Sequence, residues 1–274
     1  ICHSRNIPVV IINGRLSPKT TSTYQWVRKV LGQLLLLTDH IYARSEADRA
    51  AFIKLGADSN MVSLVGNLKY SPPSSRAIEK PGVNSEYIVA ASTHADEEIK
   101  ILQCWLKLDR PELLVIAPRH PERREEILKQ LHSLTDSIAV RSRNDEITDT
   151  TRVYLLDTVG ELNNWFAGAR LVIMGGSFIP RGGHNLLEPA HFGKAVIFGP
   201  SMENFHEEAR LMLSKHAAVQ VASVDKLCEQ LQHFLANPQA LQSLENNVAE
   251  ATAGFRHIVD DYADIISAQM TTNK

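Results

Sequence analysis

Short runs of apolar and β-branched residues recur along most of the chain, and segments of helical length separate them. The runs include 7–13 (IPVVIIN), 87–93 (YIVAAST), 113–119 (LLVIAPR), 171–176 (LVIMGG) and 195–200 (AVIFGP). Continuous apolar runs of this length are typical of strands buried on both faces of a parallel sheet. Right-handed connections turn such an alternation into a doubly wound sheet. We therefore predict an α/β fold with parallel sheets.

The remaining elements follow from the same pattern. Further strands are expected at 40–43, 62–70 with its turn, 138–140, 153–158 and 218–221. One helix is expected over 22–37, with Ser22 and Thr23 as possible caps, and another from the cap Ser45 to Leu55, ending at Gly56. Later helices are expected at 95–108, 121–134, 160–168, 185–193, 204–215, 224–236 and 238–270.

A stretch without periodicity, 71–86, holds three prolines and four serines and marks a domain boundary. We place a first domain at 1–74 and a second at 75–250. Residues 251–274 are expected to form a C-terminal helix that packs back toward the first domain. Because the chain lacks an initiator Met and leads at once into a strand pattern, we expect it to begin part-way through its first domain.

Composition excludes several classes of protein. The net charge is −2, which gives no case for nucleic-acid binding, although residues 1–80 hold 11 Lys/Arg against 5 Asp/Glu. That imbalance favours an anionic partner or reflects ordinary surface scatter. The cysteines (Cys2, Cys104, Cys228) lack CxxC spacing, so neither a zinc site nor a disulfide framework is indicated. The acidic cluster Asp145, Glu146 and Asp149 lacks EF-hand spacing and is interpreted as a solvated turn, so no metal is expected.

Polar residues follow the predicted strands of the second domain. In open parallel sheets, ligands bind outside the carboxyl ends of the strands, so these residues are the candidates for a binding site. They are Ser92, Thr93 and His94; Pro118, Arg119 and His120; Asp157, Thr158 and Gly160; Gly175, Gly176 and Ser177; and Gly199, Pro200 and Ser201.

The stretch 182–188 (GGHNLLE) favours an anion such as phosphate. Glycines let a ligand approach the backbone, and free N–H groups at a helix start attract negative charge. Gly182, Gly183, His184 and Asn185 would form this seat, and Glu188 would accept hydrogen bonds from ribose hydroxyls. The alternatives are a tight turn for the glycines and a helix-dipole contact for the glutamate.

Two arginines follow buried strands, where a guanidinium is costly unless it is paired. Arg119 is expected to meet a phosphate or carboxylate, and His120 either assists it or packs locally. Arg15 is a similar cation in the first domain and would face the cleft from the opposite side. The chain lacks GxSxG, HExxH, GxxxxGK[ST] and a GxGxxG after its first strand, which disfavours hydrolases, kinases and dinucleotide oxidoreductases.

The segment 24–37 carries apolar residues edged by Arg28 and Lys29. Such a segment either packs its leucines into the core, which we favour, or lies on an anionic membrane surface. No stretch reaches the roughly 18 apolar residues that a membrane span requires.

Taken together, several motifs resemble the 3-deoxy-D-manno-octulosonic acid (Kdo) transferases of Gram-negative bacteria. They are INGRLSPKTTSTYQWV, ASTHADEE, IAPRHPER, LLDTVGELNNWF and MGGSFIPRGGHNLLEPAHFGKAVIFGPSMENF, spread over 7–206. The resemblance implies a GT-B glycosyltransferase with two Rossmann-like domains: an acceptor-binding domain, here incomplete, and a CMP-Kdo donor-binding domain. It also implies inverting transfer of Kdo from CMP-Kdo to a lipid A precursor (lipid IVA), without metal or cofactor, at the cytoplasmic face of the inner membrane.

The resemblance assigns roles to named residues. It places Arg119 and His120 near the phosphate and the Kdo carboxylate, with Arg119 stabilising the leaving group. Gly175, Gly176 and Ser177 line the donor pocket, Asn185 and Glu188 contact phosphate and ribose, and Arg15 lies on the acceptor side. Ser201 stands where the family often has histidine. The family's general-base glutamate and membrane-anchoring segment have no counterpart in this chain, so we expect the chain alone to be soluble, to bind donor weakly and to catalyse no transfer.

Two other functions stay open. One is another GT-B enzyme, a transferase or an epimerase that uses a UDP-sugar. The other is a non-catalytic nucleotide-binding module.

Overall fold

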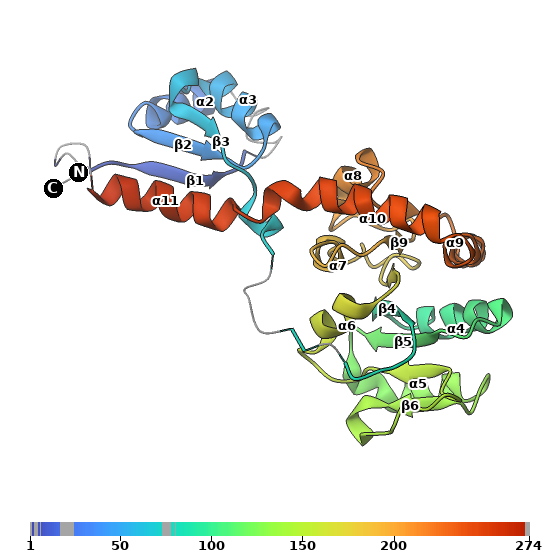
Figure 1. Ribbon diagram of the computed structural model, residues 1–274. Helices are drawn as coiled ribbons and strands as arrows, with labels where there is room; N and C mark the ends of the chain where they lie inside the picture. The colour runs from blue at the N-terminus through green and yellow to red at the C-terminus, as the bar shows by residue number, and fades with distance from the viewer. Residues whose placement is uncertain are drawn as a thin grey trace. The chain divides into compact units, whose positions relative to one another are not determined.

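A computed structural model describes residues 2, 5, 7–16, 25–72, 78–79 and 81–271. The chain divides into two compact units, and the colours of Figure 1 follow the chain from one end to the other. The first unit comprises Ile1–Pro72 with Gly254–Lys274, and the second comprises Pro73–Ala253. The sequence pattern predicts these divisions after residues 74 and 250.

The first unit contains a three-stranded parallel sheet in the order β1-β2-β3. Its core gathers Ile41, Phe52 and Val62, which are all buried. Its elements are β1 (Val10–Gly14), α2 (Gln25–Leu35), β2 (His40–Ala43), α3 (Glu46–Leu55), η2 (Ser59–Met61), β3 (Val62–Leu64), η3 (Leu68–Tyr70) and α11 (Ile258–Thr271). The proposed caps Ser22 and Thr23 lie outside the described residues.

Both ends of helix α3 lie where the sequence predicts them, because each end carries a strong capping residue. The Ser45 hydroxyl accepts a hydrogen bond from the Asp48 amide at the start of the helix. Gly56 ends the helix with a φ of 116°, a left-handed conformation that glycine adopts without a Cβ penalty. The predicted cap, span and terminating glycine are confirmed.

The C-terminal region differs from the prediction of one helix over 238–270. Helix α10 (Pro238–Thr252) ends in the short helix η6 (Ala253–Phe255), and α11 begins only at Ile258. Gly254 lies in this break, and glycine has a low helix propensity because it loses the most backbone entropy. Within the first unit, the buried Tyr262 of α11 donates from its hydroxyl to the Gly66 carbonyl at 3.0 Å.

The second unit is built on a seven-stranded parallel sheet in the order β10-β9-β8-β4-β5-β7-β6. The strands are β4 (Tyr87–Thr93), β5 (Leu113–Pro118), β6 (Ile138–Val140), β7 (Val153–Leu155), β8 (Val172–Met174), β9 (Val196–Phe198) and β10 (Val219–Gln220). The helices are α4 (Glu97–Leu108), η4 (Pro121–Arg123), α5 (Arg124–Leu131), η5 (Arg141–Arg143), α6 (Leu162–Gly168), α7 (Leu187–Ala190), α8 (His206–Ser214), α9 (Val224–Ala236) and α10.

One large core cluster unites this unit, with Trp105, Ile116 and Ile173 among its fully buried members. The apolar runs predicted as strands therefore form the central sheet, and the prediction of an α/β fold with parallel sheets is confirmed. The structure also pairs Cys104 of α4 with Cys228 of α9 in a disulfide, with 5.6 Å between their Cα atoms. Cysteine spacing did not predict this pair, because 124 residues separate the two cysteines.

No helix in the described ranges is long and apolar enough to cross a membrane.

Candidate functional site

Strands β4 and β8 lie side by side at the centre of the larger sheet, and the direction of chain progression reverses there. From β4 the chain moves outward through β5 to β6 and β7, and it then returns to place β8 on the other side of β4. Ligands of open parallel sheets bind outside the carboxyl ends of the strands at such a switch point. The residues after β4 and β8, predicted as part of a site, are brought together here.

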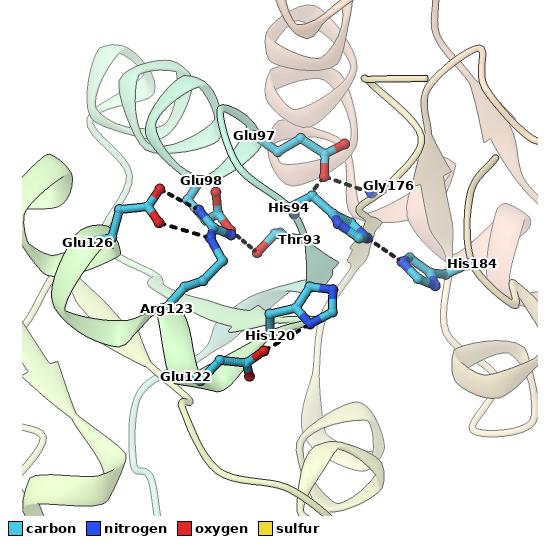
Figure 2. A network of polar contacts seen from close by, with 10 residues as sticks. All are labelled: Thr93, His94, Glu97, Glu98, His120, Glu122, Arg123, Glu126, Gly176 and His184. Carbon is cyan, nitrogen blue, oxygen red and sulfur yellow. Dashed lines mark hydrogen bonds and ion pairs between the residues drawn. The ribbon is translucent and has the colours of Figure 1, made fainter. Parts of the chain in front are cut away.

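A buried glutamate, Glu97, connects the loops that follow these two strands (Figure 2). Its Oε2 accepts hydrogen bonds from the amides of His94 at 2.9 Å and Gly176 at 2.7 Å. Its Oε1 accepts another from the Phe178 amide at 3.0 Å. Burial raises the pKa of Glu97, while the three amide donors act in the opposite direction. Glu97 was not among the predicted site residues, because an acidic residue in the first turn of a helix is ordinarily explained by the helix dipole.

The loops that Glu97 connects carry two imidazoles that contact each other. The Nε2 atoms of His94 and His184 lie 2.9 Å apart, and their ring planes differ by only 6°. The ring of His120 approaches His94 edge-on, with 5.6 Å between centroids. Burial lowers the pKa of His94 to about 4, and the neighbouring positive groups add to this shift. Burial and the charge of Arg119 also lower the pKa of His184, so we expect both rings to be neutral near pH 7.

Arg119 follows β5 with an exposed side chain, and its amide donates to the Thr93 carbonyl at 2.9 Å. Its positive charge acts on both His184 and Glu188, so these three residues share one electrostatic environment. Burial raises the pKa of Glu188, although its side chain retains an exposed surface; the Asn185 side chain and Arg119 favour its charged form. The charge of one guanidinium thus acts on an imidazole and on a carboxylate, and all three belong to segments that follow strands β5 and β8.

The glycines after β8 allow protein groups to approach one another closely. A Cβ on Gly175 would lie 2.6 Å from the Thr93 Cα and 2.7 Å from the Ser92 carbonyl oxygen. A Cβ on Gly176 would lie 2.8 Å from Cδ2 of His184, and Gly176 has a φ of +64°. Glycine is therefore required at both positions by contacts within the protein itself. Gly175 packs against the end of β4, and Gly176 packs against the imidazoles.

The predicted anion seat is only partly available. The amide of Gly182 donates to the Ser201 hydroxyl at 3.0 Å, and that of Gly183 donates to the Gly176 carbonyl at 2.9 Å. The expectation that these two amides are free is therefore wrong, since the protein itself uses them. Within the described part of the chain, no hydrogen bond occupies the amides of His184 and Asn185.

The helix after this loop is also shorter than predicted. Helix α7 covers Leu187–Ala190 instead of 185–193. The Asn185 side chain accepts from the Leu187 amide at 3.1 Å and so belongs to the turn that precedes the helix. Gly193, with a φ of 70°, has left the helical conformation. Glu188 nevertheless keeps the exposed position that binding a ligand requires.

Comparison with known proteins places this arrangement in a family. A family profile described as 3-deoxy-D-manno-octulosonic-acid transferase (kdotransferase) matches residues 1–71. A 3-deoxy-D-manno-octulosonic acid transferase of Rickettsia bellii is 32% identical over 94% of this chain and 64% of its own length. The crystal structure of the C-terminal CMP-Kdo binding domain of WaaA from Acinetobacter baumannii is 32% identical with a TM-score of 0.59, covering 61% of this chain and 89% of that domain.

The chain belongs to the Kdo transferase family. It spans 64% of the length of the Rickettsia bellii relative. The UDP-GlcNAc 2-epimerase of Neisseria meningitidis shares the fold, with a TM-score of 0.60 at 14% identity. The predicted family and the GT-B type of α/β fold are thereby confirmed.

Several of the predicted donor residues make structural contacts. The buried Ser177 hydroxyl donates to the Met174 carbonyl at 2.5 Å and accepts from the Gly199 amide at 2.7 Å. The buried Thr93 hydroxyl donates to Glu98 at 3.2 Å. These hydroxyls hold strand ends and loops together, so the expectation that they point toward a ligand is corrected.

The other predicted residues lie farther along the sheet or in the first unit. Asp157, after β7, accepts hydrogen bonds from the Ser142 amide at 2.8 Å and from the Ser142 hydroxyl, and β5 separates its strand from β4. Gly160 is exposed with a φ of 91°. Pro118 is buried as the last residue of β5, and Ser92 has a φ of 54° beside it. Arg15 is exposed at the carboxyl end of β1 in the first unit.

Among the described residues, no group of three or more His, Cys, Asp or Glu side chains is arranged to hold a metal ion.

Proposed function

We propose that the second unit binds CMP-Kdo at the β4–β8 switch point, as the donor site of a Kdo transferase. The observation that carries this proposal is the shared environment of Arg119, His184 and Glu188 at the carboxyl edge of the sheet. The identity of 32% with a solved CMP-Kdo binding domain, over 89% of that domain, supports the choice of donor. CMP-Kdo offers a phosphate and a sugar carboxylate, and an exposed guanidinium matches either anion.

The proposed reaction is an inverting transfer of Kdo to a lipid A precursor, lipid IVA, in lipopolysaccharide synthesis. A carboxylate general base, for which no residue of this chain is assigned, takes the proton of the acceptor hydroxyl, whose oxygen attacks the anomeric carbon of Kdo. The bond from that carbon to the phosphate oxygen breaks, and CMP leaves with the bonding electron pair. Arg119 stabilises the departing phosphate, and Glu188 accepts hydrogen bonds from the ribose hydroxyls. We propose that no metal or cofactor takes part, because Arg119 supplies the positive charge.

Nucleotide titration of the purified chain tests the donor site. We expect calorimetry to detect CMP binding and to show weaker binding of UDP. Arg119→Ala should weaken CMP binding by about tenfold to a hundredfold, since a charged hydrogen bond contributes about 1.5 to 3 kcal/mol. Arg143→Ala is the matched control, because Arg143 is an exposed arginine whose ion pair with Glu125 is 3.5 Å long. Equal affinity for CMP and UDP, or an unchanged affinity in Arg119→Ala, would reject this donor site.

An apolar surface on the first unit supports a peripheral membrane location. Val30, Leu34, Leu36 and Leu37 are between 49% and 70% exposed, and Lys29 is exposed beside them. Core packing, which the sequence analysis favoured, accounts for the half-buried Leu31 and Leu35 but not for these four. The side chains of Trp26, Val27 and Arg28 lie outside the described residues. We propose that this surface rests on anionic lipid at the cytoplasmic face of the inner membrane.

Vesicle co-sedimentation tests the membrane surface. The chain should sediment with phosphatidylglycerol-containing vesicles, and the double variant Leu34→Asn/Leu36→Asn should lose most of this binding. Leu64→Asn is the control, because Leu64 is 52% exposed on β3 of the same unit. Equal binding by the double variant and the control would show that the leucines do not contact lipid.

A further inference from the structure

We propose that His94 is a positioning residue that fixes the tautomer and ring plane of His184, which contacts the anionic nucleotide. The inference rests on the proposed function for the identity of that nucleotide. The relationship between the two imidazoles is a property of the protein alone, and it can be measured without a ligand.

The backbones of the two histidines are tied to one carboxylate. Glu97 accepts from the His94 amide and from the Gly176 amide (Figure 2). The Gly176 carbonyl then accepts from the Gly183 amide at 2.9 Å, directly before His184. These hydrogen bonds fix the backbones that carry the two imidazoles relative to each other, although 90 residues separate the two histidines in sequence.

The two imidazole rings restrict each other's rotation. They are almost parallel, with 5.2 Å between centroids, and the Nε2 atoms point at each other across 2.9 Å. A Cβ on Gly176 would lie 2.8 Å from Cδ2 of His184, and the same Cβ would lie 3.3 Å from Cδ2 of His94. The bare backbone of Gly176 therefore supports both rings, and a rotation of either ring would break the hydrogen bond.

One proton must lie between the two nitrogens. A hydrogen bond between two neutral imidazoles requires one Nε2–H donor and one Nε2 acceptor, so the acceptor ring carries its proton on Nδ1. A second proton is opposed by the guanidinium groups of Arg123 and Arg181, whose positive charges act on His94. Glu98, packed nearby on α4, pairs with Arg123 at 3.0 Å, and Glu97 directs its oxygens to amides.

The consequence concerns the ring nitrogen of His184 that does not face His94. The shared proton fixes whether Nε2 of His184 is protonated. In a neutral ring this also fixes whether Nδ1 donates or accepts a hydrogen bond. The positive charge of Arg119, where we place the anion, acts on His184. A ring held in one tautomer and one plane is organised before the ligand arrives, so binding loses less free energy to ordering.

Histidine-selective ¹H–¹⁵N spectra of the labelled chain at pH 7.5 test this inference. We expect His94 and His184 to occupy single, opposite tautomers. In His94→Phe, which keeps a flat ring but has no nitrogen, His184 should become a mixture of tautomers, and CMP affinity should fall about tenfold. His94→Gln, which restores a hydrogen-bonding side chain, should recover part of that affinity. His132→Phe is the control, because His132 is exposed at the end of α5.

Each outcome decides the inference. A His184 tautomer that is mixed in the unaltered chain, or unchanged in His94→Phe, overturns it whether or not CMP binds. Loss of CMP affinity in His94→Phe without a tautomer change would mean that His94 acts on the ligand directly, which also overturns it. Absence of CMP binding by the unaltered chain would reject the proposed function instead, and the tautomers would still decide the relationship between the two histidines.

Discussion

The carboxylate of Glu97 and the amide of Gly176 are joined by a 2.7 Å hydrogen bond across the β4–β8 switch point, 79 residues apart in the sequence. Glu97 stands in the first turn of α4, where the helix dipole favours negative charge. It is fully buried, and three backbone amides use its two oxygens. The residue that determines the shape of the candidate site is therefore one that need not touch a ligand.

Replacing this carboxylate should be costly. In Glu97→Gln, one oxygen becomes an NH₂ group that cannot accept, so at least one of the three amides loses its partner. We expect the free energy of unfolding of the second unit to fall by about 2 to 4 kcal/mol. Urea denaturation followed by circular dichroism measures the change.

Glu229→Gln is the matched control for Glu97→Gln. Glu229 pairs with Lys226 at 2.8 Å, and both side chains are 60% exposed, so its loss should cost less than about 1 kcal/mol. If the two variants lost the same free energy, the three amides could not be the reason for the burial of Glu97.

Local patterns predicted the fold well, and they predicted the candidate site only in outline. The apolar runs predicted the strands, and the capping residues predicted the ends of α3. Each of these signals lies within a few residues of the element that it predicts. The parallel sheet then brought Ser92, Arg119 and Gly176 to one edge, as strand-end residues of such a sheet should be. These features depend on sequence neighbours or on a general rule of topology.

The site's internal contacts depend on partners that are distant in sequence. The bond of Gly182 to Ser201 and the contact of Glu97 with Gly176 join residues 19 and 79 positions apart. The free amides expected at Gly182 were therefore wrong, and Glu97 was missed. The Cys104–Cys228 disulfide escaped prediction for the same reason.

The stability of the second unit should fall in mild acid because of His94. Its pKa is lowered from 6.5 to about 4, so between these values the unfolded chain binds a proton that the folded chain does not. The contribution of His94 is therefore constant above pH 6.5, and stability is lost as the pH falls from 6.5 toward 4. At about 1.4 kcal/mol per unit, the loss between pH 7 and pH 5 is on the order of 2 kcal/mol.

Urea denaturation at pH 7 and pH 5 tests this dependence. His94→Gln cannot titrate, so the difference in its unfolding free energy between the two pH values should be smaller by that amount. His132→Gln, which changes an exposed histidine, should behave like the unaltered chain. A pH dependence that stays the same in His94→Gln would show that His94 is not the titrating group.

Tyr262 should be the main polar anchor of α11 in the first unit. Its hydroxyl accepts from the Asn13 amide at 3.2 Å and donates to the Gly66 carbonyl at 3.0 Å, and the side chain is 2% exposed. In Tyr262→Phe both backbone groups lose this partner, so the unfolding free energy of the first unit should fall by about 1 to 3 kcal/mol. Hydrogen exchange of the amides of β1 and β2 measures the loss.

Val259→Ala provides the comparison on the same helix, since Val259 is 53% exposed and its truncation should change stability by less than about 0.5 kcal/mol. Unchanged amide protection in Tyr262→Phe would indicate that apolar contacts alone hold α11.

Gly175 should tolerate no side chain at all. The nearest atoms to an added Cβ are backbone atoms of β4, 2.6 Å away at the Thr93 Cα and 2.7 Å away at the Ser92 carbonyl oxygen. A strand inside a seven-stranded sheet cannot move aside as a flexible side chain would. Gly175→Ala should therefore lower the free energy of unfolding by about 3 kcal/mol, and it should weaken CMP binding by displacing the loops that carry His94 and Gly176.

Gly82→Ala is the matched control, because an added Cβ there meets nothing within 4 Å. Thermal unfolding and CMP titration of both variants test the prediction. A Gly175→Ala protein with ordinary stability would mean that the ends of β4 and β8 can separate, and the switch point would then not be the rigid scaffold that a donor site at this edge requires.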